Sequence, residues 1–158
     1  MDAFVQPLYE LADFDAIIRQ LKKPGIVQVS GCLDSQKAHF TNGLLREFPF
    51  RLIVAENDLK AKAFYEDFRL YDPEVLYYPA RDLIFYQADI HGNLLTRQRI
   101  QVLRALLERE EVTIVTSIDS CLDCLVPLAV WKEKVIKIRN DSEIDLDRMK
   151  RHLVELGD

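Results

Sequence analysis

The spacing of apolar residues divides the chain into short runs rich in Val, Ile and Tyr and longer amphipathic runs. Four short runs mostly lack strict alternation, as strands buried on both faces do; they cover residues 25–31, 51–56, 75–80 and 112–118. The amphipathic runs predict helices over residues 11–22, 35–47, 57–71 and 93–110. This strand–helix repetition predicts an α/β fold, with a mostly parallel sheet covered by helices on both faces.

The end of the chain follows a different pattern. Residues 133–140 alternate between apolar and basic positions, which predicts a half-exposed strand. Residues 142–158 then place Leu146, Met149 and Leu153 on one side of a predicted helix. Neither segment has an obvious partner within the chain. We therefore expect a first domain over residues 1–130 and the truncated beginning of a small α+β unit over 131–158.

Composition and charge narrow the functional classes. The 158 residues include 49% hydrophobic and 30% charged positions, enough for a buried core on a soluble chain. A formal net charge of -5 argues against a general nucleic-acid coat protein. No apolar run is long enough to span a membrane, and the acidic N-terminus does not resemble a signal peptide. Three cysteines without a disulfide framework favour a reducing, cytoplasmic location.

The loop "GCLDSQKA", residues 31–38, lies where a phosphate-binding loop would lie, between a predicted strand and a predicted helix. Gly31 and Lys37 occupy the positions of the first glycine and the lysine in that motif. Gln36 replaces the second glycine, and Ala38 replaces the hydroxyl residue that ligates magnesium. Asp34 adds a carboxylate, whose repulsion of an anion about 5 Å away is roughly 3 kcal/mol at an effective dielectric of about 20.

These substitutions leave three interpretations of the loop. It is a plain strand–turn–helix junction capped by Asp34 or Ser35, an eroded nucleotide loop, or a working nucleotide loop. The residues alone favour the plain junction over the eroded loop, and both over a working site. No paired carboxylates or Ser/His/Asp arrangement indicates hydrolytic catalysis, so the chain itself is predicted to be non-catalytic.

Two arginines are the other candidate contacts. Arg99 falls within the apolar stripe of the helix predicted over residues 93–110, where a guanidinium needs a carboxylate or backbone carbonyls. It either ties the helix to a nearby loop, with Asp82 and Asp89 as candidate partners, or contacts a ligand. Arg81 lies among aromatic residues that either stack on nucleic-acid bases or close the end of the sheet, and the acidic charge favours the second.

The pair Cys121 and Cys124 raises the question of a metal or redox site. A single pair at this spacing lacks a second pair to complete four ligands, and the three histidines show no ligand spacing. We therefore expect two helix residues that face the core, and no metal site.

The order of several segments resembles the N-terminal region of bacterial transcription-repair coupling factors, often called Mfd, which is itself similar to UvrB. The segments are Tyr78-Pro79, the acidic-aromatic stretch 82–86, Thr96-x-x-Arg99-Ile100, the strand 112–118, and Pro127. Residues 51–75 also fit the family's second strand and helix. The likeness runs from about Gly25 to the end of the chain.

The resemblance implies a helicase-like, P-loop NTPase-like sheet, similar to UvrB domain 1a, whose nucleotide motif is lost. Under this reading the loop at Gly31, Gln36, Lys37 and Ala38 is vestigial and binds no cofactor. It implies that ATP and magnesium act only in motor domains of a longer parent protein. Between Tyr77 and Asn93 there is too little chain for UvrB's long aromatic hairpin, so direct lesion recognition is not expected.

The partners that the resemblance implies are UvrA, through the largely missing second unit, and RNA polymerase and DNA, through other domains of the parent. The chain would then recruit UvrA and restrain the parent's ATP-dependent DNA translocase during nucleotide-excision repair. Two alternatives remain: a small P-loop-like nucleotide-binding enzyme that uses Lys37, and an α/β domain of unrelated role.

Overall fold

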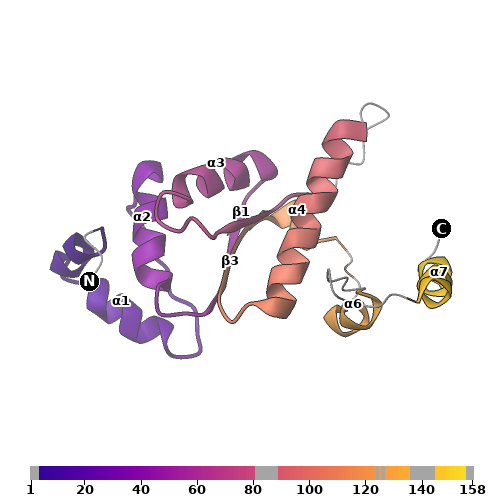
Figure 1. Ribbon diagram of the computed structural model, residues 1–158. Helices are drawn as coiled ribbons and strands as arrows, with labels where there is room; N and C mark the ends of the chain where they lie inside the picture. Colours follow the sequence, from indigo (N-terminus) through magenta and orange to yellow (C-terminus); the bar gives the residue numbers. More distant parts are fainter. Residues whose placement is uncertain (1–3, 81–88, 124, 126, 136–144, 156–158) are drawn as a thin grey trace. The chain divides into compact units, whose positions relative to one another are not determined.

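The computed structural model describes residues 4–80, 89–123, 125, 127–135 and 145–155. The chain divides into two compact units, Met1–Asp123 and Cys124–Asp158, which are described separately. The first unit is an α/β structure built on a three-stranded parallel sheet (Figure 1). The predicted α/β class with a parallel sheet is therefore confirmed. The division into domains 1–130 and 131–158 stays a prediction.

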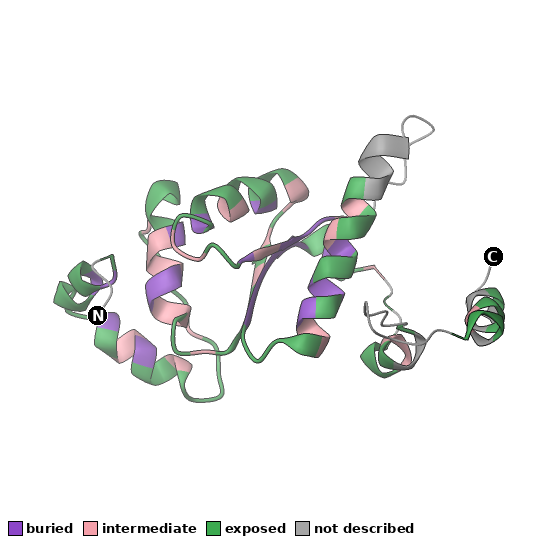
Figure 2. Ribbon diagram, in the orientation of Figure 1, coloured by how far each residue is buried: buried purple, intermediate pink, exposed green. Residues whose placement is uncertain are grey.

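The sheet has the strand order β1-β3-β2. Its strands are β1 (Phe50–Ala55), β2 (Leu76–Tyr78) and β3 (Val112–Ser117). In the parallel register, Phe50 lies opposite Val112, and Leu76 lies opposite Ile114. Every residue of the central strand β3 is buried (Figure 2). Residues 112–117 are thus buried on both faces, as the sequence predicted for this run.

The first predicted strand, residues 25–31, is not a strand of this sheet. Residues 26–33 have no regular secondary structure, and Ile26 is 99% exposed. A run with high β-propensity becomes a strand only when a neighbour accepts its backbone hydrogen bonds. The three-stranded sheet gives this segment no such neighbour, so the prediction was wrong for this structure.

Six helices accompany the strands in the described part of the first unit. They are η1 (Gln6–Glu10), α1 (Phe14–Leu21), α2 (Asp34–Leu45), α3 (Asp58–Phe68), α4 (Asp89–Glu108) and α5 (Ile118–Cys121). Asn57 caps α3, since its side chain accepts a hydrogen bond from the N–H of Lys60 at 2.9 Å. Each long helix overlaps the range that its apolar spacing predicted.

Helices cover both faces of the sheet. One face packs with α2 and α3 in a cluster that includes Ala38, Ala61, Phe68 and Val115. The other face packs with α4 in a second cluster: Tyr78, Val102, Ala105, Val112 and Ile114. Near the N-terminus, η1 and α1 bury a third apolar cluster: Val5, Leu8, Phe14 and Ile18. The packing on these two faces fixes the positions of the strand ends, and therefore of the loops that follow them.

The second unit contains α6 (Leu128–Lys134) and α7 (Leu146–Glu155). The strand predicted over residues 133–140 was wrong at its start, because Glu133 and Lys134 end α6; residues 136–140 lie outside the described part. The helix predicted over residues 142–158 corresponds to α7. Across the described residues, no helix is both long and apolar enough to cross a bilayer.

Candidate functional site

The carboxyl ends of the three parallel strands meet at one edge of the sheet, which is where α/β proteins usually bind ligands. The loop of residues 31–38 leads into α2, and α3 begins directly after β1. Ala38 in the first turns of α2 and Ala61 in the first turn of α3 belong to one core cluster, so the two helix starts lie close together. The contacts of the candidate nucleotide loop at this edge therefore decide whether its residues are available to a phosphate.

The backbone of the loop turns at Gly31, which has a φ of +89°. That value lies in the region that favours glycine, so the first glycine of the motif has a conformational reason. Further along, the Gln36 side chain accepts a hydrogen bond from the N–H of Leu33 at 3.3 Å. The helix start is thus capped by Gln36, not by Asp34 or Ser35 as the sequence suggested.

Lys37 is paired within its own helix. Its Nζ lies 2.6 Å from Oδ1 of Asp34, and the Asp34 side chain is 96% exposed. Hydrogen bonding and charge from Lys37 lower the pKa of the Asp34 carboxyl group. The cation that would reach toward phosphates is therefore locally neutralised by a carboxylate one helical turn away.

Ala38 faces the interior of the protein. It is 3% exposed and belongs to the core cluster that contains Phe68 and Val115. The position that carries a magnesium-binding hydroxyl in a phosphate loop is here a packing position. At these three positions of the motif the structure thus has an apolar core residue, a paired lysine and a capping glutamine.

The carboxylate of Asp58 joins all three strand ends, although the sequence shows it only as part of a helix start. Asp58 follows β1, and its Oδ1 accepts hydrogen bonds from the N–H of Ala80 at 3.2 Å and the hydroxyl of Ser117 at 3.3 Å. Ala80 follows β2, and Ser117 ends β3. The Asp58 side chain therefore holds the three strand ends together at the carboxyl edge. The sequence feature that could have indicated this role is the position of Asp58 shortly after a predicted strand.

Arg99 lies on α4 and reaches the same end of the sheet. It is 8% exposed, and its Nη1 donates to the carbonyl of Pro79 at 2.7 Å and lies 2.8 Å from Oδ2 of Asp123. Its guanidinium also lies over the ring of Tyr78, 4.2 Å from the ring centre. Arg99 thus ties α4 to the residues that follow β2 and α5.

The structure gives Arg99 an acidic partner that was not predicted, Asp123. The side chains of the two predicted candidates, Asp82 and Asp89, lie outside the described part of the chain, as does Arg81. The sequence gives no sign of the pair with Asp123, because that residue is distant from Arg99 along the chain and lies between two cysteines. Cys121 itself is exposed, which corrects the expectation that it faces the core.

Two aromatic residues before this edge are core residues. Tyr77 and Tyr78 of β2 are 7% and 6% exposed. The hydroxyl of Tyr77 donates to the backbone carbonyl of Asp58 at 3.4 Å, and burial, together with that contact, raises the pKa of Tyr77. Tyr77 packs in the core cluster under α3 and Tyr78 in the cluster under α4, so the two rings fill opposite faces of the sheet. Phe85 and Tyr86, from the same predicted cluster, lie outside the described residues.

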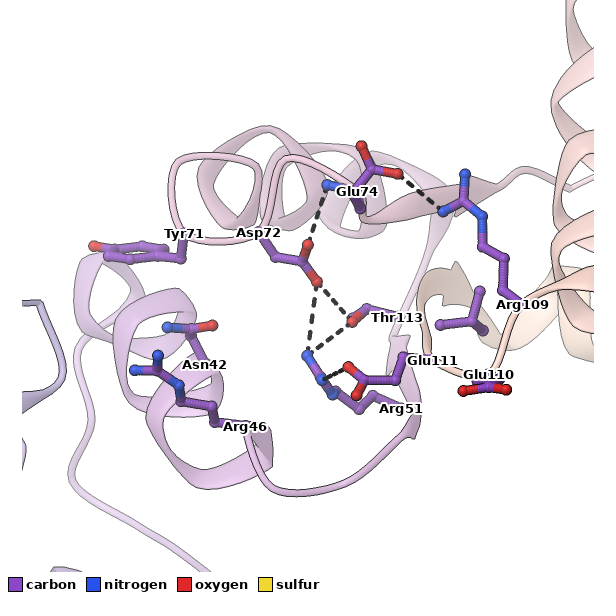
Figure 3. Close-up of a pocket in the computed structure, with 11 residues that line it drawn as sticks. Asn42, Arg46, Arg51, Tyr71, Asp72, Glu74, Arg109, Glu110, Glu111 and Thr113 are labelled. Carbon is purple, nitrogen blue, oxygen red and sulfur yellow. Dashed lines mark hydrogen bonds and ion pairs between the residues drawn. The ribbon is translucent and has the colours of Figure 1, made fainter. Parts of the chain in front are cut away.

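A second candidate region lies at the opposite, amino end of the sheet, where a cavity of about 760 Å³ opens between α2, β1 and β3 (Figure 3). Arg51 donates to the hydroxyl of Thr113 at 3.2 Å and lies 3.7 Å from Asp72, to which Thr113 donates at 2.7 Å. Arg109 pairs with Glu74 on the rim at 3.2 Å. Arg51 and Arg109 are thus each paired with a carboxylate, and these pairs join β1 and β3 to the residues before β2.

Neither end of the sheet carries a cluster of metal ligands in the part of the chain that the structure describes. The geometry defines an α/β module in which the described polar side chains at the carboxyl edge, Asp58 and Arg99, contact other parts of the same unit. No protein-family model matches the chain.

Searches of known proteins place the chain beside two kinds of DNA-repair factor. It is 25% identical over 134 residues to the transcription-repair-coupling factor of Staphylococcus epidermidis, which covers 83% of this chain and 12% of the relative. It is 27% identical over 165 residues to the UvrABC system protein B of Treponema pallidum, covering 93% of this chain and 24% of the relative. It is 32% identical over 120 residues to the UvrABC system protein B of Anaplasma phagocytophilum, and this match covers 66% of this chain and 18% of the relative.

The resemblance drawn from the ordered motifs is therefore confirmed: this chain is similar to transcription-repair-coupling factors and to UvrB. The similarity fits a UvrB-like region of the coupling factor. The chain spans about one eighth of the length of the coupling factors that it matches, as the 12% coverage states.

Proposed function

We propose that this chain is a non-catalytic UvrB-like module of a transcription-repair coupling factor that acts in nucleotide-excision repair. Its role is to recruit UvrA and to restrain the ATP-dependent DNA translocase of the longer parent protein. The similarity to coupling factors and UvrB supports the pathway. The observation that carries the non-catalytic assignment is the burial of Ala38 in the core.

The chemistry of the loop supports the loss of nucleotide binding step by step. A magnesium nucleotide needs a hydroxyl ligand, a lysine directed at the outer phosphates and backbone amides free to face them. Ala38 supplies no hydroxyl, and Lys37 lies against Asp34. Gln36 uses its side chain to cap the helix start. Each of these residues contributes to the local fold instead of to a ligand.

The remaining parts of the reaction belong to the parent protein. ATP and magnesium act in its motor domains, and RNA polymerase and DNA are bound through other domains. UvrA binds through the unit that begins in Cys124–Asp158. This division leaves a helicase-like fold with a binding role in place of a motor role.

The test is binding of purified UvrA to the immobilised parent protein that contains residues 1–158, by biolayer interferometry, because the resemblance places most of the UvrA-binding unit outside these residues. We expect saturable binding that the charge reversal Lys150→Glu in α7 weakens by about tenfold, because rim charges at interfaces steer association. Lys62→Glu, an exposed position of α3 in the first unit, is the matched control and leaves the affinity unchanged. Wild-type protein that does not bind UvrA at tens of micromolar would overturn the recruitment role.

A further inference from the structure

The cavity at the amino end of the sheet contains polar groups that no described contact uses. Its volume of about 760 Å³ lies within the range of ligand sites in proteins. Its walls come from α2, from β1 and β3, and from the residues before β2 (Figure 3). All of these elements belong to the first unit, Met1–Asp123. The cavity is therefore a property of one unit, and the groups that line it can be compared directly.

Asn42 of α2 is a buried group on the wall of this cavity. It is 7% exposed, and Figure 3 shows it across from Arg51 and Thr113. Its side-chain amide makes no hydrogen bond with the part of the chain that the structure describes. A buried amide normally has a partner, because its desolvation without one destabilises the fold. The Asn42 amide is thus available to a group that enters the cavity.

The charges around the cavity leave an acidic excess. Arg51 lies 3.7 Å from Asp72 and 3.5 Å from Glu111. Arg109 pairs with Glu74 at 3.2 Å, and Arg46 also interacts within the chain. The carboxylate of Glu110 has no ion pair or hydrogen bond with the described residues. The cavity is therefore complementary to a ligand that brings a positive charge. The charged residues that line it are Arg46, Arg51, Asp72, Glu74, Arg109, Glu110 and Glu111.

A basic peptide segment matches both available groups. The amide of Asn42 presents one carbonyl acceptor and an NH₂ donor, and a peptide group presents the complementary donor and acceptor. The carboxylate of Glu110 forms a charge-assisted hydrogen bond with an arginine or lysine side chain. Asn42 lies on α2 and Glu110 between α4 and β3, so the ligand must reach across the cavity. A segment of a few residues does so, because an extended chain advances about 3.3 Å per residue.

We propose that this cavity binds a basic segment of a partner protein, with a peptide group at Asn42 and an arginine or lysine side chain at Glu110. The rim suits a protein ligand, because the side chains of Glu74 and Glu111 are 78% and 74% exposed and can face a partner surface. The site lies at the end of the sheet opposite to the loop of residues 31–38. It goes beyond the proposed function and does not depend on it.

A nuclear magnetic resonance titration of residues 1–158 tests the proposal. The probes are a blocked peptide, acetyl-Gly-Arg-Gly-Gly-amide, and the same peptide with Gln or Glu in place of Arg. We expect the Arg peptide to shift the side-chain NH₂ signals of Asn42 and the N–H signal of Glu110, with an affinity at least about fivefold higher than that of the Gln peptide. Equal affinities for the Arg and Gln peptides, tighter binding of the Glu peptide, or no shift at millimolar peptide would each overturn the proposal.

Charge removal on the rim identifies the group that pairs with the cation. Glu110→Gln keeps the shape of an exposed side chain and should weaken binding of the Arg peptide about fivefold. Glu56→Gln, which removes an exposed carboxylate at the opposite end of the sheet, is the matched control and leaves the affinity unchanged. Equal losses in the two variants would show a general charge effect, and the proposal would be wrong.

Asn42→Leu separates a binding role from a structural one. The substitution replaces an unpaired amide by an apolar side chain of similar size, so the ratio of folded to unfolded protein in urea titrations should stay the same or rise. Affinity for the Arg peptide should fall at least about tenfold. A fall in the folded ratio with unchanged peptide affinity would show that Asn42 serves only the fold and would overturn the proposal.

Discussion

Two cations at the carboxyl edge of the sheet, Lys37 and Arg99, show how differently a charge can be used in one small domain. The Lys37 side chain is 52% exposed and contacts an aspartate in its own helix. Arg99 is 8% exposed and joins α4 to Pro79, Asp123 and the ring of Tyr78. The residue placed in the loop motif makes a local pair, whereas the residue placed in the helix stripe connects three segments.

The difference shows that the position of a residue in a sequence motif does not indicate how much that residue contributes to the stability of the fold. An exposed pair within one helix contributes a few tenths of a kcal/mol, because water screens both charges. A buried guanidinium that loses its partner leaves a charge with a large desolvation cost. The most direct way to break this comparison is to remove each cation in turn.

The largest effect is expected for Arg99→Met, which keeps a long apolar side chain and removes the charge. The carbonyl of Pro79 and the carboxylate of Asp123 both lose the bonds from this guanidinium. We expect the free energy of unfolding to fall by about 3 kcal/mol, measured by urea denaturation. Arg104→Met, in an exposed pair on the same helix, is the control and should change it by less than about 0.5 kcal/mol.

A smaller effect is expected for Ala38→Ser, which restores a hydroxyl at the motif position. Because Ala38 is packed in the core, the hydroxyl is buried among apolar groups and the free energy of unfolding should fall by about 1–2 kcal/mol. Ala63→Ser, at an exposed position of α3, is the matched control. Unchanged stability together with new magnesium-nucleotide binding would contradict the packing role of Ala38.

Measurements at alkaline pH extend the comparison to an uncharged residue near the carboxyl edge, Tyr77. The folded pKa of Tyr77 is raised, so the unfolded state loses its proton first as pH rises above about 10. The stabilisation is fully present below that pH, and about 1 kcal/mol is lost by pH 11. Tyr77→Phe should remove this part of the alkaline loss in denaturation curves at pH 9 and pH 11. An identical loss in both proteins would show that Tyr77 does not contribute.

The smallest effect is expected for Lys37→Ala. Its pair with Asp34 is exposed, so the free energy of unfolding should change by less than about 0.5 kcal/mol in the same titration. A loss comparable to that of Arg99→Met would remove the distinction between the two cations.

Much of the fold could be predicted from residue spacing. The run over residues 112–118 lacks strict alternation and indicated a strand buried on both faces, and the amphipathic run over 57–71 indicated α3. The spacing along α4 also placed Arg99 in an apolar stripe, where burial was expected. These features depend on neighbours within a few positions, which the sequence displays directly.

What the sequence could not supply depends on distant partners. Residues 25–31 have the composition of a strand, but a strand also needs a paired neighbour, and the sheet offers none in this structure. The partner of Arg99 is Asp123, which lies just after α5 and is distant from α4 along the chain. The cap of α2 is a local exception, because the Gln36 side chain accepts from the N–H of Leu33 only three positions away.

The central claim is that the loop at Lys37 serves the fold and holds no nucleotide. Isothermal titration calorimetry of residues 1–158 with Mg-ATP and Mg-ADP, with Lys37→Ala as control, tests it most directly. We predict no binding heat at millimolar nucleotide for either protein. Micromolar binding that requires both magnesium and Lys37 would contradict the claim and would favour a nucleotide-binding enzyme.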